Sequence, residues 1–171
     1  MREGSAPRWW QWLWLSAAVV ALDLASKAWL AHILVPGEPH DLTPFLRIVL
    51  VYNSGAAFSF LAGAGGWQRW FFAAIAVLIS IVLVIVLRRH RGPAIVAAAL
   101  ALVLGGALGN LWDRLTLGRV TDFVLLHAGD HSWPAFNVAD SAITVGVAIL
   151  IWESLWPKRG PAPGALPGED A

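Results

Sequence analysis

The sequence predicts an all-α polytopic membrane protein with four transmembrane helices. Of its 171 residues, 58% are hydrophobic and only 13% are charged, whereas about a quarter of the residues in a soluble domain are charged. Four segments are long and apolar enough to cross a hydrocarbon core about 30 Å thick. The basic residues flank these segments in a pattern that gives all four a consistent orientation.

The first predicted span covers residues 9–31. Within it, Asp23 and Lys27 are four residues apart near the outer end, so on a helix they share a face and can pair. We interpret this pair first as structural and only second as part of the chemistry. The same stretch also has the basic start, apolar run and small residues of a cleaved secretory signal peptide, an alternative that stays open.

The first outer loop covers residues 32–66. Its β-branched and aromatic residues at 45–52 predict one or two strands. The polar, small-residue segment 53–59 comes next and begins with Asn53, Ser54 and Gly55. An Asn-x-Gly sequence is typical of a turn, but Asn53 could also point into a site while Gly55 lets backbone approach a ligand.

Three further spans are predicted at 67–87, 94–114 and 139–156, and residues 1–156 are expected to form a single membrane-embedded domain. Segment 157–171 is rich in Pro and Gly and is predicted to be a disordered tail. With four spans, both termini and the basic connector 88–93 lie on one side. We expect that side to be cytoplasmic, because cytoplasmic flanks are enriched in Lys and Arg.

Composition excludes several classes of function. The net charge of +1 and the short, scattered basic groups give no indication of a nucleic-acid partner. The absence of cysteine excludes a disulfide scaffold, a cysteine-ligated metal site and a thiol nucleophile together.

The predicted topology brings the polar residues to one depth. All of them lie at outer span ends or in outer loops, whereas random placement would scatter them between the two leaflets. Because an ionised group in a membrane needs a partner or a task, we predict that one set forms an active site: Asp23, Lys27, Asn53, Asn110, Asp113, Arg114, Asp122, Asn137 and Asp140.

Parts of this set have structural alternatives. Gly105 and Gly109 have the spacing of helix pairs that approach closely, so packing alone would explain them, although a functional role is also open. Asp113 and Arg114 could form an interfacial ion pair that ends the third span, or they could contact a substrate.

Two further pairs have simple structural interpretations. Asn137 and Ser141 could cap the last helix, because Asn and Ser are favoured at helix starts. His127 and His131 have a spacing that could bind a metal on a helix, but Gly129 lies between them and no carboxylate motif accompanies them. We favour solvated loop histidines and predict no metal site and no cofactor.

Asp122, expected in the second outer loop, and Asp140 are harder to explain structurally. Two carboxyls in a low dielectric cannot both ionise when they are close, so one pKa rises and the other falls. The ionised member could take a proton from water while the neutral member polarises a carbonyl, which would hydrolyse an amide. The sequence contains no Gly-x-Ser-x-Gly, His-Glu-x-x-His or phosphate-binding glycine loop.

Five motifs in order resemble the bacterial lipoprotein signal peptidases, also called signal peptidase II, and the resemblance extends from Trp9 to Trp156. The motifs are Asp23-Leu24-Ala25-Ser26-Lys27, the segment from Asn53 to Ser59, the segment from Gly105 to Arg114, Val120-Thr121-Asp122-Phe123, and the segment from Phe136 to Ser141.

The resemblance implies an intramembrane aspartyl protease with four transmembrane helices and a small extracytoplasmic β-sheet. Such enzymes remove the signal peptide from diacylglyceryl-modified prolipoproteins by cutting before the lipidated cysteine. The resemblance implies that the catalytic dyad is Asp122 and Asp140. It further implies two groups of residues: pocket residues Asn53, Asn110, Arg114 and Asn137, and supporting residues Asp23, Lys27, Asp113, Gly105 and Gly109.

The resemblance also implies a location and partners. We expect a monomer in the bacterial cytoplasmic (inner) membrane that works among membrane lipids, with both termini cytoplasmic and the site facing the extracytoplasmic side. Other classes remain open at this point. A small proton-coupled transporter would use similar carboxylates but is expected to show repeats or broken helices. A phospholipid-headgroup transferase would want a metal-binding acidic cluster, and a scaffold would tolerate loss of either aspartate.

Overall fold

The computed structural model describes residues 8–55, 65–129 and 131–155 of the chain. Its helices are η1 Trp9–Trp12, α1 Leu13–Ile33, α2 Gln68–Arg89, α3 Ala94–Thr116 and α4 Val138–Leu155. Four of the helical segments are long and apolar enough to cross a membrane, the first of them combining η1 with α1. The predicted fold class is therefore confirmed. Ala56–Ser59 of the Asn53 motif, Trp156 and the tail 157–171 lie outside the described residues.

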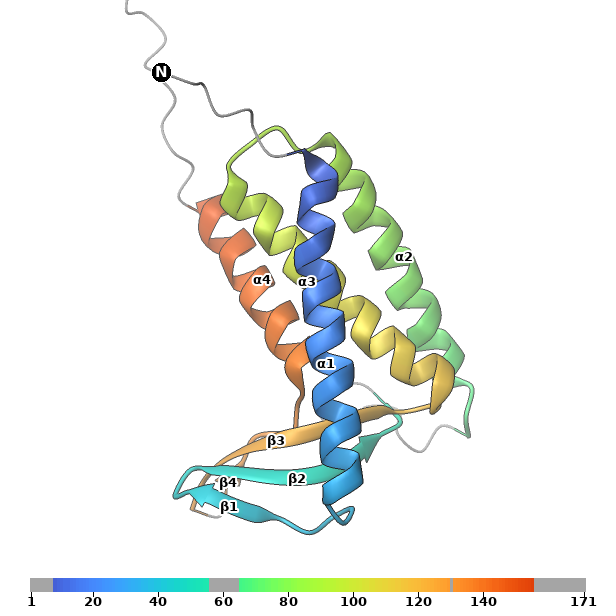
Figure 1. Cartoon of the computed structure of the whole chain (residues 1–171), viewed down its shortest axis with the longest axis vertical. Coiled ribbons are helices and arrows are strands. Elements are labelled where there is room, and N and C mark those ends of the chain that lie inside the picture. Colours follow the sequence, from blue (N-terminus) through green and yellow to red (C-terminus); the bar gives the residue numbers. More distant parts are fainter. Residues whose placement is uncertain (1–7, 56–64, 130, 156–171) are drawn as a thin grey trace, which may run out of the picture.

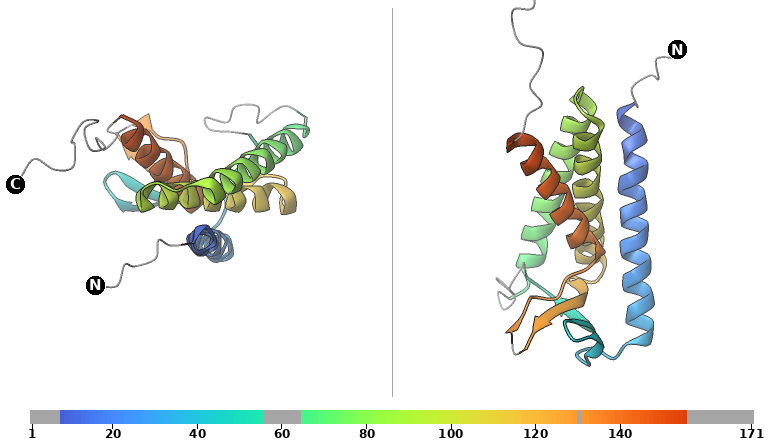
Figure 2. Two further views of the ribbon diagram at one scale, coloured as in Figure 1. Left: turned by 90° about the horizontal axis from the view of Figure 1, so that it is seen from above. Right: turned by 90° about the vertical axis from the view of Figure 1, so that its left-hand side faces the viewer.

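Helix α3 is the centre of the bundle, because α1, α2 and α4 all pack against it (Figure 1). Seen from above, α2, α3 and α4 form a layer and α1 lies on one side of it (Figure 2). The buried residues of α3 are mostly small or aliphatic. Lipid tails are as apolar as these side chains, so close van der Waals packing rather than the hydrophobic effect holds such helices together.

Two glycines of α3 allow α1 to approach closely. A Cβ added at Gly105 would lie 2.7 Å from Cβ of Val19, and one added at Gly109 would lie 2.7 Å from Oδ2 of Asp23. Real Cβ atoms do not approach other atoms so closely. The packing interpretation of Gly105 and Gly109 is confirmed, and it brings Asp23 against the face of α3.

Two other glycines bring α3 and α4 together. A Cβ added at Gly106 would lie 2.3 Å from the carbonyl oxygen of Ala139, and one added at Gly146 would lie 2.7 Å from that of Ala99. Gly105 and Gly109, four residues apart, lie on the face of α3 that meets α1. Gly106 lies on the neighbouring face of α3, which meets α4. The contact at Gly106 is next to Asp140, so it sets the position of that residue.

A four-stranded antiparallel sheet, in the order β1-β2-β3-β4, lies at one end of the bundle (Figure 1). Its strands are β1 His40–Thr43, β2 Leu46–Asn53, β3 Val120–Ala128 and β4 His131–Ser132. The strand predicted at 45–52 is confirmed as β2. The loop expected around Asp122 is wrong, because this residue lies on β3 opposite Val51. Its partner strand is distant in the sequence, so local pattern alone did not reveal β3.

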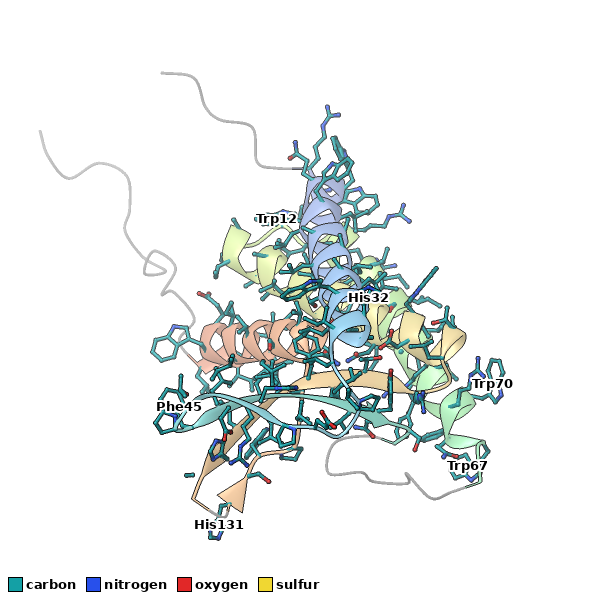
Figure 3. All side chains as sticks on the ribbon, turned by 60° about the horizontal axis from the view of Figure 1, so that its bottom comes forward. Trp12, His32, Phe45, Trp67, Trp70 and His131 are labelled. Carbon is teal, nitrogen blue, oxygen red and sulfur yellow. The ribbon has the colours of Figure 1, made fainter. Side chains whose placement is uncertain are left out.

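The sheet adjoins the end of α1, the start of α2, the end of α3 and the start of α4, whereas the connector between α2 and α3 is at the opposite end (Figure 1). Tryptophans occur at both ends, with Trp12 at the end away from the sheet and Trp67 and Trp70 at the sheet end (Figure 3). This distribution is typical of aromatic belts at the two membrane surfaces.

Candidate active site

Residues from α3, α4, β2 and β3 surround a cavity of about 800 Å³ where the bundle meets the sheet. Five members of the predicted active-site set line this cavity: Asn53, Asn110, Arg114, Asp122 and Asp140. Asn137 is fully buried beside them. The structure thus brings both candidate carboxyls and all four candidate pocket residues into one place.

Asn137 connects the two carboxyl groups. Its Nδ2 donates a hydrogen bond of 2.7 Å to Oδ1 of Asp122. Its Oδ1 accepts one of 2.9 Å from the backbone N–H of Asp140, and its own backbone N–H donates one of 3.2 Å to Oδ2 of Asp140. This reciprocal arrangement is a capping box at the start of α4. In one conformation, Asn137 therefore caps α4 and donates a hydrogen bond to Asp122.

Asn110 holds Asp140 from the side of α3. Its Nδ2 donates a hydrogen bond of 2.7 Å to Oδ1 of Asp140. Its Oδ1 accepts from Nζ of Lys27 at 3.1 Å and from Nδ2 of Asn137 at 3.2 Å. Because these two donors fix which end of the amide accepts, Nδ2 must face Asp140.

Lys27, Asp23 and Asp113 form a buried ion cluster beneath the cavity. Nζ of Lys27 lies 2.7 Å from Oδ2 of Asp23 and 3.2 Å from Oδ2 of Asp113. The predicted pairing of Asp23 with Lys27 is confirmed. The interpretation that Asp113 pairs with Arg114 is wrong, because α1 presents Lys27 to Asp113 and the Arg114 side chain lies along the cavity instead.

Both carboxylates of the cluster also bind backbone. Oδ1 of Asp23 accepts a hydrogen bond of 2.9 Å from N–H of Ala139, one of the first N–H groups of α4, which have no partner within the helix. Oδ2 of Asp113 accepts one of 2.9 Å from N–H of Thr121 on β3. The cluster therefore ties the start of α4 and the strand that carries Asp122 to the helices α1 and α3.

Arg114 and Asn53 complete the cavity wall. Arg114 donates from Nη1 to the carbonyl oxygen of Asn110 at 3.2 Å and from Nη2 to that of Gly55 at 3.4 Å. Oδ1 of Asn53 accepts from N–H of Gly55 at 2.9 Å, and its Nδ2 donates to Oδ2 of Asp122 at 3.4 Å. Asn53 therefore makes a turn and also points to Asp122 in the cavity, and the approach of a ligand to Gly55 stays a prediction.

The electrostatics of the cavity act on Asp122, which lies on β3, outside the spanning helices. Burial, followed by the charge of Asp140, raises the pKa of Asp122 from its ordinary value of 3.8 to about 7. Hydrogen bonds from Asn137 and Asn53 and the charge of Lys27 act in the opposite direction. A group with this pKa gains and loses a proton readily near neutral pH, which is what general acid–base chemistry requires.

The remaining candidates have structural roles. Ser141 donates from Oγ to the carbonyl oxygen of Asn137 at 2.9 Å, so it does not cap the N-terminus of α4. His127 and His131 lie on the paired strands β3 and β4, so the helix that the metal alternative needed is wrong, and so is the solvated loop that we favoured, since the side chain of His127 is largely buried. Among the described residues, no group of three or more metal-binding side chains is gathered in one place.

One element of the site was not detected in the sequence. The backbone of Phe136 accepts hydrogen bonds from N–H of Phe123 and Val124, and its own N–H donates to the carbonyl oxygen of Val124 at 2.9 Å. This bridge holds the segment before α4 against β3 and sets Asn137 beside Asp122. Backbone contacts of this kind leave no residue-type signal in a sequence.

Known proteins resemble this chain over most of its length. Residues 15–156 match the family described as Signal peptidase (SPase) II. A lipoprotein signal peptidase of Paraburkholderia phymatum is 48% identical over 149 residues, which cover 87% of this chain and 90% of that protein. One of Azoarcus is 48% identical over 155 residues, which cover 88% of each chain.

Two solved structures share the fold. One, described as a bacterial membrane enzyme structure by the in meso method at 2.3 Å resolution, gives a TM-score of 0.77 at 32% identity and covers 85% of this chain and 87% of that one. The other, described in the same words at 1.9 Å resolution, gives a TM-score of 0.75 at 31% identity, with coverage of 87% and 94%.

Proposed function

The chain belongs to the signal peptidase II family, and from that premise we propose that Asp122 and Asp140 are its catalytic pair. It is a multi-pass bacterial membrane enzyme with aspartic-type lipoprotein signal peptidase activity, which cleaves signal peptides from prolipoproteins. The observation that carries the proposal is that a single side chain, Asn137, hydrogen-bonds Asp122 and caps the turn that bears Asp140.

The proposed reaction uses one shared proton. Ionised Asp140 takes a proton from a water molecule whose oxygen attacks the scissile carbonyl carbon, while protonated Asp122 donates its proton to the carbonyl oxygen. The tetrahedral intermediate then collapses. Its hydroxyl proton returns to Asp122, Asp140 gives its proton to the leaving nitrogen, and the C–N bond breaks to give a carboxyl and a free amine. A pKa of Asp122 near 7 suits it to donate and recover that proton.

We propose that the substrate carries a diacylglyceryl group and is cut before the modified cysteine. The cavity supports this, because its polar groups are concentrated beside the carboxyls while apolar side chains line the rest: Val51, Leu126, Trp133, Ile143 and Val145. Four of these, Val51, Leu126, Trp133 and Val145, are also exposed. Acyl chains could thus enter from the bilayer along α4 while the peptide bond reaches the carboxyls.

We further propose that both termini are cytoplasmic and that the site faces the extracytoplasmic side. The distribution of basic residues supports this orientation. At the end of the bundle away from the sheet, three arginines without an ion-pair partner among the described residues are grouped at 88–91. At the sheet end, Lys27 and Arg47 are paired with carboxylates, and the other basic residues, Arg69, Arg114 and Arg119, are dispersed along the chain. We also propose a monomer and a single domain to residue 156, because α1, α2 and α4 all pack on α3 and both candidate carboxyls line one cavity beside it.

The test is cleavage by the purified protein in detergent of a prolipoprotein with its diacylglyceryl group, alongside the same polypeptide without it. Mass spectrometry of the products identifies the bond that is cut. The proposal predicts cleavage before the modified cysteine, unaffected by a chelator, with the unlipidated substrate cut far more slowly. Equal cleavage of both substrates, or cleavage at another bond, would overturn the substrate assignment, and inhibition by the chelator would overturn the metal-free reaction.

A further inference from the structure

A second cavity lies between α1 and α2 and has no lining residue in common with the active-site cavity. It is a groove of about 660 Å³, walled by Ala17, Val20 and Ala21 of α1 and by Ile81 and Val84 of α2, with Leu104 of α3 between them. Two serines also line it, but Oγ of Ser16 donates to the carbonyl oxygen of Ala101 and Oγ of Ser80 to that of Ala76, each at 2.8 Å. The groove therefore offers hydrocarbon and no free hydroxyl.

The groove exists because α1 presents small side chains where it faces α2. Ala17 and Ala21 are exposed within the described structure and leave unfilled the space that a larger residue would occupy. In a membrane, a groove of this composition is filled by hydrocarbon, and the natural occupant is the acyl chain of a lipid.

Trp9 of η1 and Arg88 near the end of α2 contact each other beside the groove, and the start of η1 and the end of α2 lie at the end of the bundle away from the sheet (Figure 1). Arg88 follows Val84 by four residues, so it continues the groove face of α2, and Trp9 begins η1, the short 3-10 helix that precedes α1. Cζ of Arg88 lies 5.4 Å from the ring centroid of Trp9. Trp9 and Arg88 thus contact each other at the end of the groove where the headgroup of a bound lipid would lie.

The mouth carries uncompensated positive charge. Arg88 and the neighbouring Arg89 and Arg91 are exposed, and none pairs with a carboxylate in the described part of the chain. Neither α2 nor the connector contains an Asp or Glu, and Glu153 of α4, at the same end of the bundle, forms no ion pair with these arginines. This charge favours a ligand whose head is anionic, because a zwitterionic head brings a cation toward the same arginines. Basic pockets between transmembrane helices bind anionic lipid headgroups in this way.

We propose that this groove is a binding site for an anionic phospholipid, with one acyl chain between α1 and α2 and the phosphate against Arg88. The site is separate from the catalytic cavity, and the inference does not rest on the proposed catalytic roles. Trp9 holds the guanidinium over the opening through a cation–π contact and lies at the depth of the headgroups.

The test is lipid binding to the delipidated protein in detergent, measured by native mass spectrometry. The probes are phosphatidylglycerol and phosphatidylcholine with identical acyl chains. We expect tighter binding of phosphatidylglycerol and a larger rise in the thermal midpoint. Arg88→Gln should weaken phosphatidylglycerol binding about fivefold, the contribution of one basic side chain near a headgroup. The matched control Arg91→Gln, which removes the same charge from the connector, should have a clearly smaller effect.

A second pair of variants tests the groove itself. Ala17→Phe fills it and should abolish binding of the lipid, whereas Val82→Phe places the same aromatic ring at an exposed position of α2 that does not line the groove. Retained cleavage activity shows that each variant is folded. Equal binding of the two lipids, equal losses in Arg88→Gln and Arg91→Gln, or undiminished binding to Ala17→Phe would each overturn the proposal.

Discussion

Asp122 is the residue whose protonation sets the chemistry, and the side chains around it tune that protonation. Asn137 and Asn53 donate hydrogen bonds to its two oxygens, and both bonds lower its pKa against the larger effect of burial. Asn137 cannot be changed without altering the cap of α4. Asn53 offers a simpler probe.

We predict that kcat/KM of the wild type falls as pH rises through about 7, because Asp122 loses the proton that it donates. In Asn53→Ala the ionised form loses a hydrogen bond, so the pKa rises and the falling limb moves to higher pH. A pH profile of kcat/KM for both proteins measures this, with Asp41→Asn in the sheet as the control. A limb that stays in place or moves to lower pH contradicts the role given to Asn53.

The same residue affects stability. The unfolded chain releases the proton of Asp122 near the ordinary pKa of 3.8, whereas the folded chain keeps it until about 7. Between these values the folded state binds more protons, so this group lowers the free energy of unfolding as pH rises. Asp122→Asn cannot titrate, so this fall in the free energy of unfolding with pH is absent from the variant.

We therefore predict that Asp122→Asn gains thermal stability relative to the wild type as pH is raised from about 5 to about 8. Tryptophan fluorescence on heating measures the midpoints of both proteins at each pH. A difference that is constant with pH, or that shrinks toward high pH, would show that Asp122 is not a raised-pKa acid in the folded protein.

At the scale of elements, the contact between α3 and α4 sets the position of Asp140. Only glycine fits at Gly106, because a Cβ there would lie 2.3 Å from the carbonyl oxygen of Ala139. Backbone is on the other side of this contact, so relief requires one helix to shift. A shift of about 1 Å in a catalytic group can cost about a hundredfold in rate.

Gly106→Ala should therefore lower kcat by about a hundredfold while the protein still inserts and purifies. Gly92→Ala in the connector is the matched control, since its Cβ would meet only the side chain of His90. Cleavage assays on both variants decide the point. Activity of Gly106→Ala within about twofold of the wild type would mean that the helix contact tolerates the methyl group without moving Asp140.

The elements also show where sequence reasoning succeeded and failed. The spans and β2 were predictable because hydropathy and β-branched content are local properties. β3 was not, because its strand character depends on pairing with β2. Likewise, the pairing of Lys27 with Asp113 depends on how closely α1 approaches α3, and the spacing of Asp113 and Arg114 indicated a different partner.

For the whole molecule, the four-span topology was enough to predict which polar residues converge. Every one of them is in the half of its span nearer the sheet or in a segment beside the sheet, so the direction of the helices alone brings them together. The hydrogen bonds that fix the orientation of these side chains could not be predicted from the sequence. The proposed orientation across the membrane rests on the same topology.

The chain has no cysteine, so single cysteines can report this orientation without background. Ser132→Cys on β4, which is exposed, should react with a membrane-impermeant maleimide added to intact cells or spheroplasts. Gly92→Cys in the connector should react only after the membrane is opened. The reverse pattern would place the sheet and the cavity in the cytoplasm.

The most direct measurement of the central claim is single-turnover cleavage of a diacylglyceryl prolipoprotein by Asp122→Asn and Asp140→Asn. Asp41→Asn is the matched control, because Asp41 is an exposed aspartate of the sheet outside the cavity. If both carboxyls are catalytic, Asp122→Asn and Asp140→Asn each abolish cleavage while the protein stays folded. The control Asp41→Asn then cleaves like the wild type. Substantial cleavage by either cavity variant would contradict the catalytic pair.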